Sequence, residues 1–598
     1  MQTSTTSGDP ASARKGRYAT ESIKRLTLTG HAHLDLAWSW RPAEARVEAH
    51  DTARSAVEIL EGHPSATFVM SQAVTYHWLS EDDPELFARI RHLVDAGRWE
   101  PVGGWWVEAD LFGASPTSIA RQAVLGQQTF ERLLGRRCRI GFSPDTFGHP
   151  AWLPRLLVDA GMSVYVITRP SEEESGLPPV FLWVGNDGSR VKVAHLREYD
   201  GVPADDPAGL CLYGVGNHGG GPTREHLAVA DQLCSGGTAR HGSIESWANE
   251  VRESELPVIH GDLAHHARGC YATLTSFKER MRSLERRLVQ LDSPIERWEP
   301  LLFWQFHDVL AGTSVAEVYE EAIADLVAVD RSVAAPVPTL GTARTIVPRH
   351  RVDEGRPVVA RETLGQPWAG WVEVSWISSR PASGIEVVDH DAALLHVEQH
   401  GTAWRLHAIV DLALGPHEQR ELRWKPVAGK GPTRSPAPTG ARLVVVDDPT
   451  DTWGHTLVRY GDEVEPTPAT RLHCAGGPGG LVEVWGEWYE RDRALKLVLP
   501  FDLLPADLTD GLHGTDGEMP GGDWEGPVWG RVWSYDVVDE GNITSLRITV
   551  RRSPPYALHD PLRRIPEIEF SYTDQGSFCS RYWLRPQPSR PPPLLTTQ

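Results

Sequence analysis

Three residues that can bind a metal ion occur at every second position near the start of the chain: His31, His33 and Asp35. They come directly after the alternating apolar run 26–30, which is typical of a β-strand. Residues two apart in an extended chain point to the same side, so His33 and Asp35 can direct a ring nitrogen and a carboxylate oxygen at one ion. The competing interpretation is a set of polar loop residues that cap the next helix.

Asp145 is the next candidate, in the segment SPDTFGH at 143–149. It follows an expected strand, and Pro144 and Gly148 predict a tight turn that lifts its carboxylate to the end of the sheet. In (β/α) barrels the catalytic groups lie at the C-terminal ends of strands. The alternative is a turn aspartate that caps a helix beginning at 151.

The pair His307 and Asp308 lies inside a helical apolar run that includes 301–306. A single histidine in such a run is more often a satisfied core residue than a ligand. The adjacent carboxylate and the break at 311–313 favour a site at this point instead.

Together, His33, Asp35, Asp145 and His307 make a ligand set of two nitrogens and two oxygens. This set suits zinc, with cobalt or manganese as alternatives. A catalytic ion also leaves room for substrate oxygens. The four positions therefore predict a catalytic metal centre.

The elements that must hold these residues change in character along the chain. Short apolar strands alternate with helical stretches from 24 to 260, which predicts a parallel α/β sheet or barrel. An apolar period of three to four residues then predicts packed helices, and short alternating strands after Pro336 predict β-sandwich material. The predicted organisation is a disordered lead (1–22), a (β/α) barrel catalytic domain (23–262), a helical bundle (263–335), β-sandwich domains (336–584) and a Pro-rich, disordered tail (585–598).

The composition restricts the class of protein. The 598 residues carry a net charge of -21, which argues against a nucleic-acid partner because phosphate binding needs positive charge. Six cysteines without a CxxC pair indicate reduced thiols and a cytoplasmic location. The sequence shows no secretory signal and no run long enough to span a membrane. The 23 tryptophans suit a sugar site, although burial in a core is their commoner role.

Five motifs occur in order: HAHLDLAW at 31–38, GGWWVEAD at 103–110, SPDTFGHPAWLP at 143–154, YGVGNHGGGPT at 213–223 and QFHDVLAGTS at 305–314. The series resembles glycoside hydrolase family 38, the zinc-dependent retaining α-mannosidases, in its bacterial-type cytosolic form. The similarity runs from Leu26 to Val333 and continues more weakly at 448–455, 493–502 and 546–561. The resemblance implies a multidomain fold of α/β, α and β parts: a (β/α)7-type barrel, a three-helix bundle that supplies one zinc histidine, and C-terminal β-sandwich domains.

The resemblance also implies roles for individual residues. His33, Asp35 and His307 match zinc ligands, with one Zn2+ per subunit and Co2+ or Mn2+ as alternatives. Asp145 matches the catalytic nucleophile, which also touches the zinc. Positions that stack on the sugar or hold its hydroxyls correspond to Trp38, Asp110 and Asp308.

The Gly-rich loop departs from some relatives. Another branch of the family carries an aspartate there that could be the general acid, whereas this chain has Asn217 followed by His218, which we expect at the substrate. Asparagine is no useful proton donor. The acid is therefore left open among Asp110, Asp308, His218 and a carboxylate not yet placed.

The resemblance implies a metal-dependent retaining exo-α-mannosidase that removes terminal α-linked mannose from oligosaccharides or mannosides. The metal would hold the sugar 2- and 3-hydroxyls, and Asp145 would form a covalent glycosyl intermediate. The alternative within the family is a mannosyl-conjugate hydrolase such as a mannosylglycerate hydrolase. Lesser alternatives are an amidohydrolase-like metal enzyme and a non-catalytic sugar-binding protein. No nucleic-acid or membrane partner is expected, and the family suggests an assembly of identical subunits.

Overall fold

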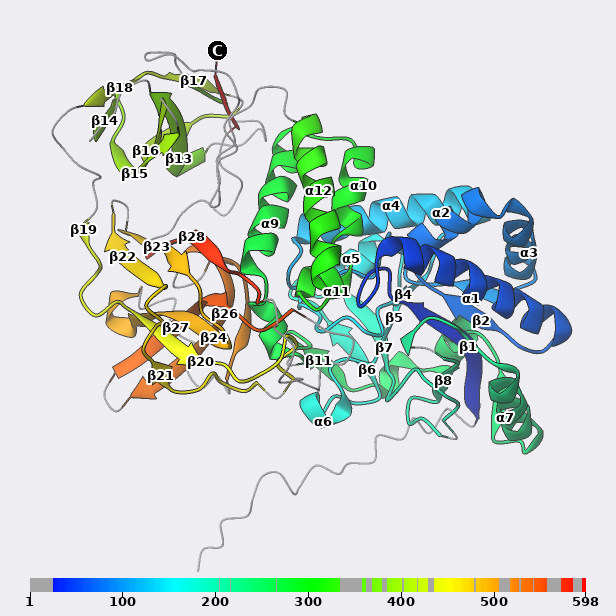
Figure 1. Cartoon of the computed structure of the whole chain (residues 1–598). Coiled ribbons are helices and arrows are strands. Elements are labelled where there is room, and N and C mark those ends of the chain that lie inside the picture. The colour runs from blue at the N-terminus through cyan, green and yellow to red at the C-terminus, as the bar shows by residue number, and fades with distance from the viewer. Residues whose placement is uncertain are drawn as a thin grey trace, which may run out of the picture.

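The computed structural model of the chain shows an α/β N-terminal half, a group of helices and a C-terminal half of β-sheets (Figure 1). It describes residues 25–203, 205–215, 217–264, 266–333, 358–361, 368–378, 384–400, 403–416, 418–427, 435–455, 457–477, 480–504, 517–525, 529–540, 543–556, 572–584 and 594–597. The predicted disordered lead lies outside these residues. Within them, no helix combines the length and apolar character that crossing a bilayer requires. The cytoplasmic location and the assembly of subunits stay predictions.

Strand β1 (Leu26–Leu34) lies inside the first sheet, and all nine of its residues are buried. Neighbours on both edges, together with buried faces, account for its largely apolar sequence. It pairs in parallel with β2 (Phe68–Met70), β8 (Leu210–Tyr213), β9 (Asn217–His218) and β10 (Ala239–His241), and β2 pairs in parallel with β3 (Trp99–Pro101). Because β1 ends at Leu34, His33 and Asp35 lie at the carboxyl edge of the sheet, as the sequence predicts.

The second sheet has the strand order β11-β6-β7-β5-β4, in which only β6 and β7 are antiparallel. Its strands are β4 (Ile140–Phe142), β5 (Val164–Ile167), β6 (Val180–Val184), β7 (Arg190–His195) and β11 (Val258–His260). The backbone N–H of Gly103, just after β3, donates to the carbonyl of Ile140 in β4 at 2.8 Å. The described strands thus form two neighbouring sheets, and the closed barrel stays a prediction.

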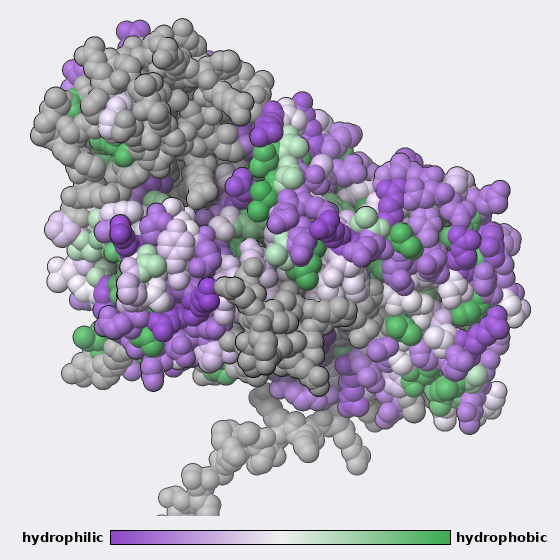
Figure 2. All heavy atoms as spheres, in the orientation of Figure 1, coloured by the Kyte–Doolittle hydropathy of each residue, from purple (hydrophilic) through white to green (hydrophobic). Residues whose placement is uncertain are grey.

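Helices cover the strands of the N-terminal half, and the visible face over them is largely hydrophilic (Figure 2). Helix α4 (Pro116–Leu134) shows why they begin and end where they do. The Ser115 hydroxyl accepts a hydrogen bond from Ser118 N, Pro116 occupies the first turn, and Gly135 ends the helix with a φ of 69°. The other helical elements are α1 (Pro42–Gly62), α2 (Ala73–Asp82), α3 (Pro84–Asp95), α5 (Leu153–Asp159), α6 (Glu172–Ser175), α7 (Arg224–Ser235), α8 (Ile244–Glu250), η2 (Glu253–Glu255) and η3 (Arg268–Tyr271).

Four helices join the two halves: α9 (Thr275–Gln290), α10 (Ile295–Phe303), α11 (His307–Ala311) and α12 (Ala316–Val333). Helices α9, α10 and α12 pack against one another, and α10 also packs against α4. Asp574 of the C-terminal half accepts hydrogen bonds from the first backbone N–H groups of α9, at 2.7 Å from Thr275 N and 2.9 Å from Ser276 N. The short helix α11 carries His307 back to the N-terminal sheets.

Every strand pair described in the C-terminal half is antiparallel. The expected strands at 371–375 and 495–499 are confirmed as parts of β13 and β24. Residues 585–593 lie outside the described part of the chain, but the expected disorder of the tail is wrong for Leu594–Thr597. These residues form β29, whose backbone pairs with β12. The elements are β12 (Val358–Arg361), β13 (Trp368–Ser378), β14 (Gly384–Val387), β15 (Ala392–His400), β16 (Ala403–Leu414), β17 (Gln419–Leu422), β18 (Trp424–Val427), β19 (Ser435–Pro436), β20 (Arg442–Asp447), β21 (Glu463–Val464), β22 (Arg471–Gly476), β23 (Leu481–Trp488), β24 (Arg493–Pro500), η5 (Phe501–Leu503), β25 (Met519–Glu525), β26 (Trp529–Glu540), β27 (Ile543–Arg552), β28 (Gly576–Trp583) and β29.

Arg552, at the end of β27, fixes the contact between the C-terminal half and the helices. Its fully buried guanidinium donates to Asp448 Oδ2 at 2.8 Å, to Thr273 Oγ1 at 2.6 Å and to the Thr452 carbonyl at 2.8 Å. Gly269 makes room for it, since a Cβ there would lie 2.7 Å from Arg552 Cζ. The network holds the loop at 451–455 against η3.

We expect Gly126→Ala to destabilise the N-terminal half. An added Cβ would lie 2.4 Å from the Trp105 carbonyl carbon and 2.5 Å from the Gly104 oxygen, so α4 would have to move away from this segment. Overpacking of this kind costs about 2 kcal/mol. Thermal unfolding followed by circular dichroism should show a lower Tm.

Gly62→Ala is the matched control, because a Cβ at Gly62 meets nothing within 4 Å. That substitution should leave the Tm unchanged or raise it slightly, since alanine is the better helix former. An unchanged Tm for Gly126→Ala would contradict the close approach of α4 and the 104–105 backbone.

Candidate metal centre and active site

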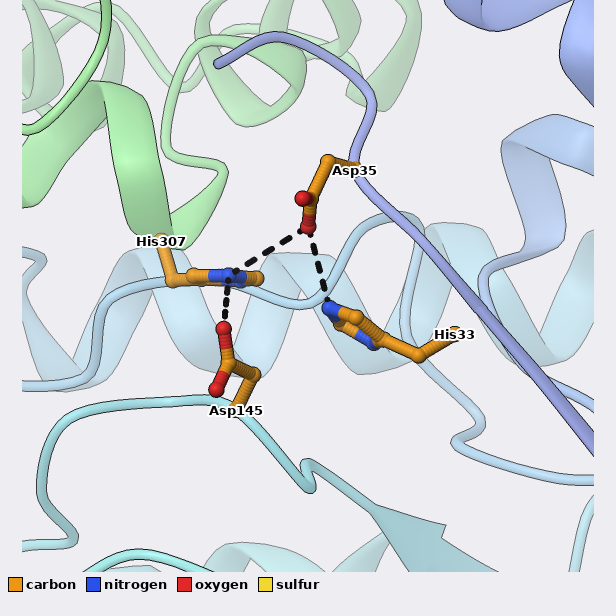
Figure 3. Close-up of side chains that lie close together, drawn as sticks. All are labelled: His33, Asp35, Asp145 and His307. Atoms are coloured by element: carbon orange, nitrogen blue, oxygen red, sulfur yellow. Dashed lines mark hydrogen bonds and ion pairs between the residues drawn. The ribbon is translucent and has the colours of Figure 1, made fainter. Parts of the chain in front are cut away.

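Four buried side chains from three separate segments meet at one point (Figure 3). His33 and Asp35 come from the end of β1, Asp145 from the loop after β4, and His307 from the first residue of α11. Their four ligand atoms lie within 4.8 Å of one another. Asp35 Oδ1 is 3.1 Å from His33 Nε2 and 3.9 Å from His307 Nε2, which in turn is 3.4 Å from Asp145 Oδ2. The fold therefore brings together the four residues from which the sequence predicts a metal site.

Glu108, which the sequence reasoning missed, holds these segments together. It is fully buried, and its Oε2 lies 3.2 Å from His33 Nδ1. Its Oε1 accepts hydrogen bonds from the backbone N–H groups of Asp145 at 2.9 Å and Thr146 at 3.1 Å. The Glu108 carbonyl accepts from His307 N at 2.9 Å. One residue thus contacts three of the four candidate ligands.

Glu108 also fixes the orientation of both imidazole rings. His33 Nδ1 faces the Glu108 carboxylate, and His307 Nδ1 lies 3.2 Å from the Glu108 backbone carbonyl oxygen. A carboxylate or carbonyl on Nδ1 is the usual partner of a metal-binding histidine, since it leaves Nε2 with a free lone pair. In this structure both Nε2 atoms face the meeting point of the four side chains.

The protonation of the two histidines reflects a strongly negative site. Burial by itself lowers the pKa of His33, but the Glu108 and Asp35 carboxylates outweigh it and raise that pKa well above its usual value. Burial likewise opposes protonation of His307, but Asp145, Asp308 and Glu108 raise its pKa to about 9. A site that draws protons onto both rings also favours a metal cation in their place.

Asp145 is held as a carboxylate anion. Burial favours its neutral form, but Arg169 and His307 outweigh burial and hold its pKa well below the usual range. Arg169 Nε donates to Asp145 Oδ1 at 3.1 Å, and the Tyr199 hydroxyl donates to the same oxygen at 2.8 Å. The other oxygen, Oδ2, faces His307. Nearby, the ring of His31 binds the Tyr199 carbonyl, and burial lowers the pKa of His31 to about 4.

The residues present fit a divalent metal ion. His307 Nε2 is buried and makes no hydrogen bond within the described part of the chain, although carboxylate oxygens lie 3.4 to 3.9 Å away. Two imidazole nitrogens and two carboxylate oxygens are the ligands that zinc accepts in catalytic sites. The ring orientations set by Glu108 supply the second requirement of such a site, fixed outer partners.

Asp308, Asp110 and Trp38 lie at different places around this centre. Asp308 Oδ2 is 3.7 Å from His307 Nε2, and burial together with the nearby Asp35 and Asp145 carboxylates raises its pKa to about 7. Asp110 is almost buried and accepts a hydrogen bond from Gly113 N. Trp38 is half-buried and packs against an apolar cluster of Phe147, Ala267, Cys270, Ala311 and Trp453.

Asn217 and His218 reach the site through their backbone. They form β9, which pairs in parallel with β1 so that Asn217 lies beside His33 and His218 beside Leu34. The Gly-rich loop thus runs along the edge that carries the first two candidate ligands.

Phe147 separates His307 from a group of aromatic and charged side chains. The Phe147 ring is 5.7 Å from the His307 ring on one side and 5.6 Å from the His266 ring on the other. His266 Nδ1 contacts Glu174 at 2.8 Å, and its ring is 4.7 Å from that of His455. His455 belongs to the loop that Arg552 fixes, so the C-terminal half contributes to the surroundings of the site.

Comparison with known proteins finds similarity to glycosyl hydrolases. Residues 24–208 match the glycosyl hydrolases family 38 N-terminal domain. Alpha-mannosidase G of Dictyostelium discoideum is 28% identical over 349 residues, which cover 51% of this chain and 32% of that protein. Alpha-mannosidase 2C1 of Homo sapiens is 30% identical over 354 residues, covering 52% and 34%. The matched part of the chain thus spans about a third of the length of these relatives.

More distant likenesses extend over more of the chain. A putative mannosylglycerate hydrolase of Halalkalibacterium halodurans is 22% identical over 411 residues, covering 57% of this chain and 45% of that protein. The crystal structure of an alpha-mannosidase from Enterococcus faecalis V583 has a TM-score of 0.59 at 12% identity, covering 96% of this chain and 87% of that chain, which shows a shared fold. The family match includes the segments of His33, Asp35 and Asp145. Residues 24–208 of this chain are therefore similar to the N-terminal domain of glycosyl hydrolases family 38.

Proposed function

We propose that this protein is a metal-dependent α-mannosidase that removes terminal α-linked mannose from oligosaccharides or mannosides. The observation that carries the proposal is the position of Asp145. Its ionised carboxylate lies beside two histidines whose Nε2 atoms face one point, in a domain of glycosyl hydrolase family 38. Retaining cleavage needs a carboxylate nucleophile, and a metal ion held beside it would polarise oxygens of the substrate.

The residues proposed to hold the metal are His33, Asp35, Asp145 and His307. A bound zinc ion, or cobalt or manganese in its place, would supply a Lewis acid for the vicinal 2- and 3-hydroxyl oxygens, which lie on the same side of mannose. Glu108 positions the ligands and does not itself need to touch the sugar.

Asp145 is the proposed nucleophile. Its carboxylate attacks the anomeric carbon, the bond to the leaving oxygen breaks, and water then hydrolyses the glycosyl ester with net retention. Arg169 and His307 keep Asp145 ionised. Arg169 and Tyr199 hold Oδ1, which leaves Oδ2 directed at the site.

Several residues are proposed to contact the sugar: Trp38, Asp110, Asp308, Asn217 and His218. The proton donor for the leaving group is expected among Asp110, Asp308, His218 and a carboxylate not yet placed. The pKa of Asp308, about 7, would let this side chain hold a proton near neutral pH, as a general acid must.

We further propose that the two N-terminal sheets belong to one (β/α)7-type barrel, 23–262, supported by the hydrogen bond from Gly103 N to Ile140 O. The mutual packing of α9, α10 and α12 supports a three-helix bundle within 263–335. The antiparallel sheets that follow support β-sandwich domains within 336–584.

A mannosyl-conjugate hydrolase is the second candidate function. The specific observation in its favour is the similarity to a putative mannosylglycerate hydrolase, which extends over more of the chain than the matches to the two α-mannosidases but at lower identity. The same metal centre and nucleophile would serve both reactions, and the aglycone would differ.

The first test is hydrolysis of 4-nitrophenyl α-mannoside. Chelation should abolish release of 4-nitrophenol, and added zinc or cobalt should restore it. Asp145→Asn and His307→Ala should each lower kcat/KM by at least about 10³-fold, because one removes the nucleophile and the other a ligand.

Asp159→Asn, which alters an exposed aspartate on α5, should retain wild-type activity. Full activity in Asp145→Asn would refute the assignment of the nucleophile. A folded, metal-loaded wild type that binds mannose but turns over no α-mannoside, mannosylglycerate included, would instead indicate a sugar-binding protein.

Glu108→Gln should weaken zinc binding about 10- to 100-fold, since it removes the charge that faces His33 Nδ1 while keeping the shape of the side chain. Competition against a coloured chelator measures the affinity. Glu131→Gln, at an exposed position on α4, is the control and should bind zinc as the wild type does. Equal affinities in both variants would show that Glu108 does not position the ligands.

A further inference from the structure

Three residues far from the candidate active site repeat its ligand chemistry: His63, Asp231 and His241. Asp231 Oδ1 is 3.0 Å from His63 Nε2 and 2.8 Å from His241 Nε2. The rings of the two histidines are 5.8 Å apart, and one ligand atom from each of the three residues lies within 4.8 Å of the others. Two imidazoles thus point the same nitrogen at one carboxylate oxygen.

We propose that His63, Asp231 and His241 form a second divalent-cation site, of the class that zinc occupies, with water at the remaining position. Zinc binds imidazole at about 2.0–2.1 Å and carboxylate at about 2.0–2.2 Å, so ligand atoms around a tetrahedral ion are roughly 3.3 Å apart. The two observed separations are slightly shorter than that. Small side-chain rotations therefore suffice to admit an ion.

The charge balance around Asp231 supports a cation. Within the described residues, no arginine or lysine forms an ion pair with Asp231. Asp82 shows the contrast, because it contacts His50 at 3.2 Å and also forms an ion pair with Arg46.

The accessibility of the cluster suits a site that is loaded from solution. The side chain of His241 is only 7% exposed, whereas those of His63 and Asp231 are 29% and 40% exposed. The buried histidine can fix the position of the ion while the exposed side leaves room for water. Two histidines, one carboxylate and a water are one of the ligand sets that zinc accepts.

The site would join three elements of the N-terminal half (Figure 1). His63 directly follows α1, Asp231 lies in α7, and His241 ends β10. β10 pairs with β1 so that His241 lies beside Leu28, five residues before His33 in the same strand. Five residues of strand span roughly 17 Å, so the two metal centres are separate.

The test is the number of zinc ions that the full chain retains. Chelated protein is mixed with zinc chloride, passed through gel filtration and measured by plasma mass spectrometry. We expect two ions per chain for the wild type and for the control Asp82→Asn. Asp231→Asn and His307→Ala should each retain one ion, and the double variant Asp231→Asn/His307→Ala should retain none. Because each substitution removes one site only, the result for the second site does not depend on whether the proposed mannosidase function is correct.

His307→Ala also isolates the second site for titration with zinc chloride by calorimetry. One ion should bind with a Kd below about 10 µM, and zinc should raise the Tm of His307→Ala but not of the double variant. His63→Ala guards against a folding defect of Asp231→Asn, since it should cause the same loss of one ion. Equal zinc content in the wild type, Asp231→Asn and His63→Ala would overturn the proposal.

Discussion

The arrangement of the candidate active site depends on one buried carboxylate, that of Glu108. It faces His33 Nδ1 on one side and accepts backbone hydrogen bonds from Asp145 and Thr146 on the other. A buried carboxylate is costly unless charged or hydrogen-bonded partners surround it. The fold satisfies Glu108 only by bringing the end of β1 and the loop after β4 together, and this same contact brings the candidate ligands to one point. The Glu108 carbonyl adds His307 to the set.

The elements around Glu108 hold its segment from several directions. Gln72 Oε1 accepts from Glu108 N at 3.0 Å, and Gln122 of α4 accepts from Val107 N at 3.1 Å. Gly126 lets α4 pack directly against the backbone of Gly104 and Trp105, which precede Val107 and Glu108. The hydrogen bonds of Arg552 hold the C-terminal half against the helices. A site of opposite charges in low dielectric is sensitive to small displacements, which explains why so many contacts restrain it.

The candidate ligands could be predicted because each has a local pattern. His33 and Asp35 come at the end of an apolar strand, Asp145 lies in a turn with Pro144 and Gly148, and His307 lies in an apolar helical stretch beside a second carboxylate. Glu108 has no such pattern, although it lies in the motif at 103–110. Its hydrogen-bond partners at Asp145 and Thr146 are 37 and 38 residues away. His63 and Asp231 are 168 residues apart. Contacts of this range follow from how strands and helices pack, which no short window of sequence contains.

The most direct test of the account is anomalous diffraction at the zinc absorption edge, from zinc-loaded crystals of Asp231→Asn. We expect a single peak about 2.0–2.1 Å from the Nε2 atoms of His33 and His307, with Asp35 and Asp145 oxygens completing the protein ligands. Both Nδ1 atoms should remain on Glu108. A zinc ion bound through Nδ1, or one that is not bound by His307 or Asp145, would contradict the metal centre described here and the role of Glu108 in positioning its ligands.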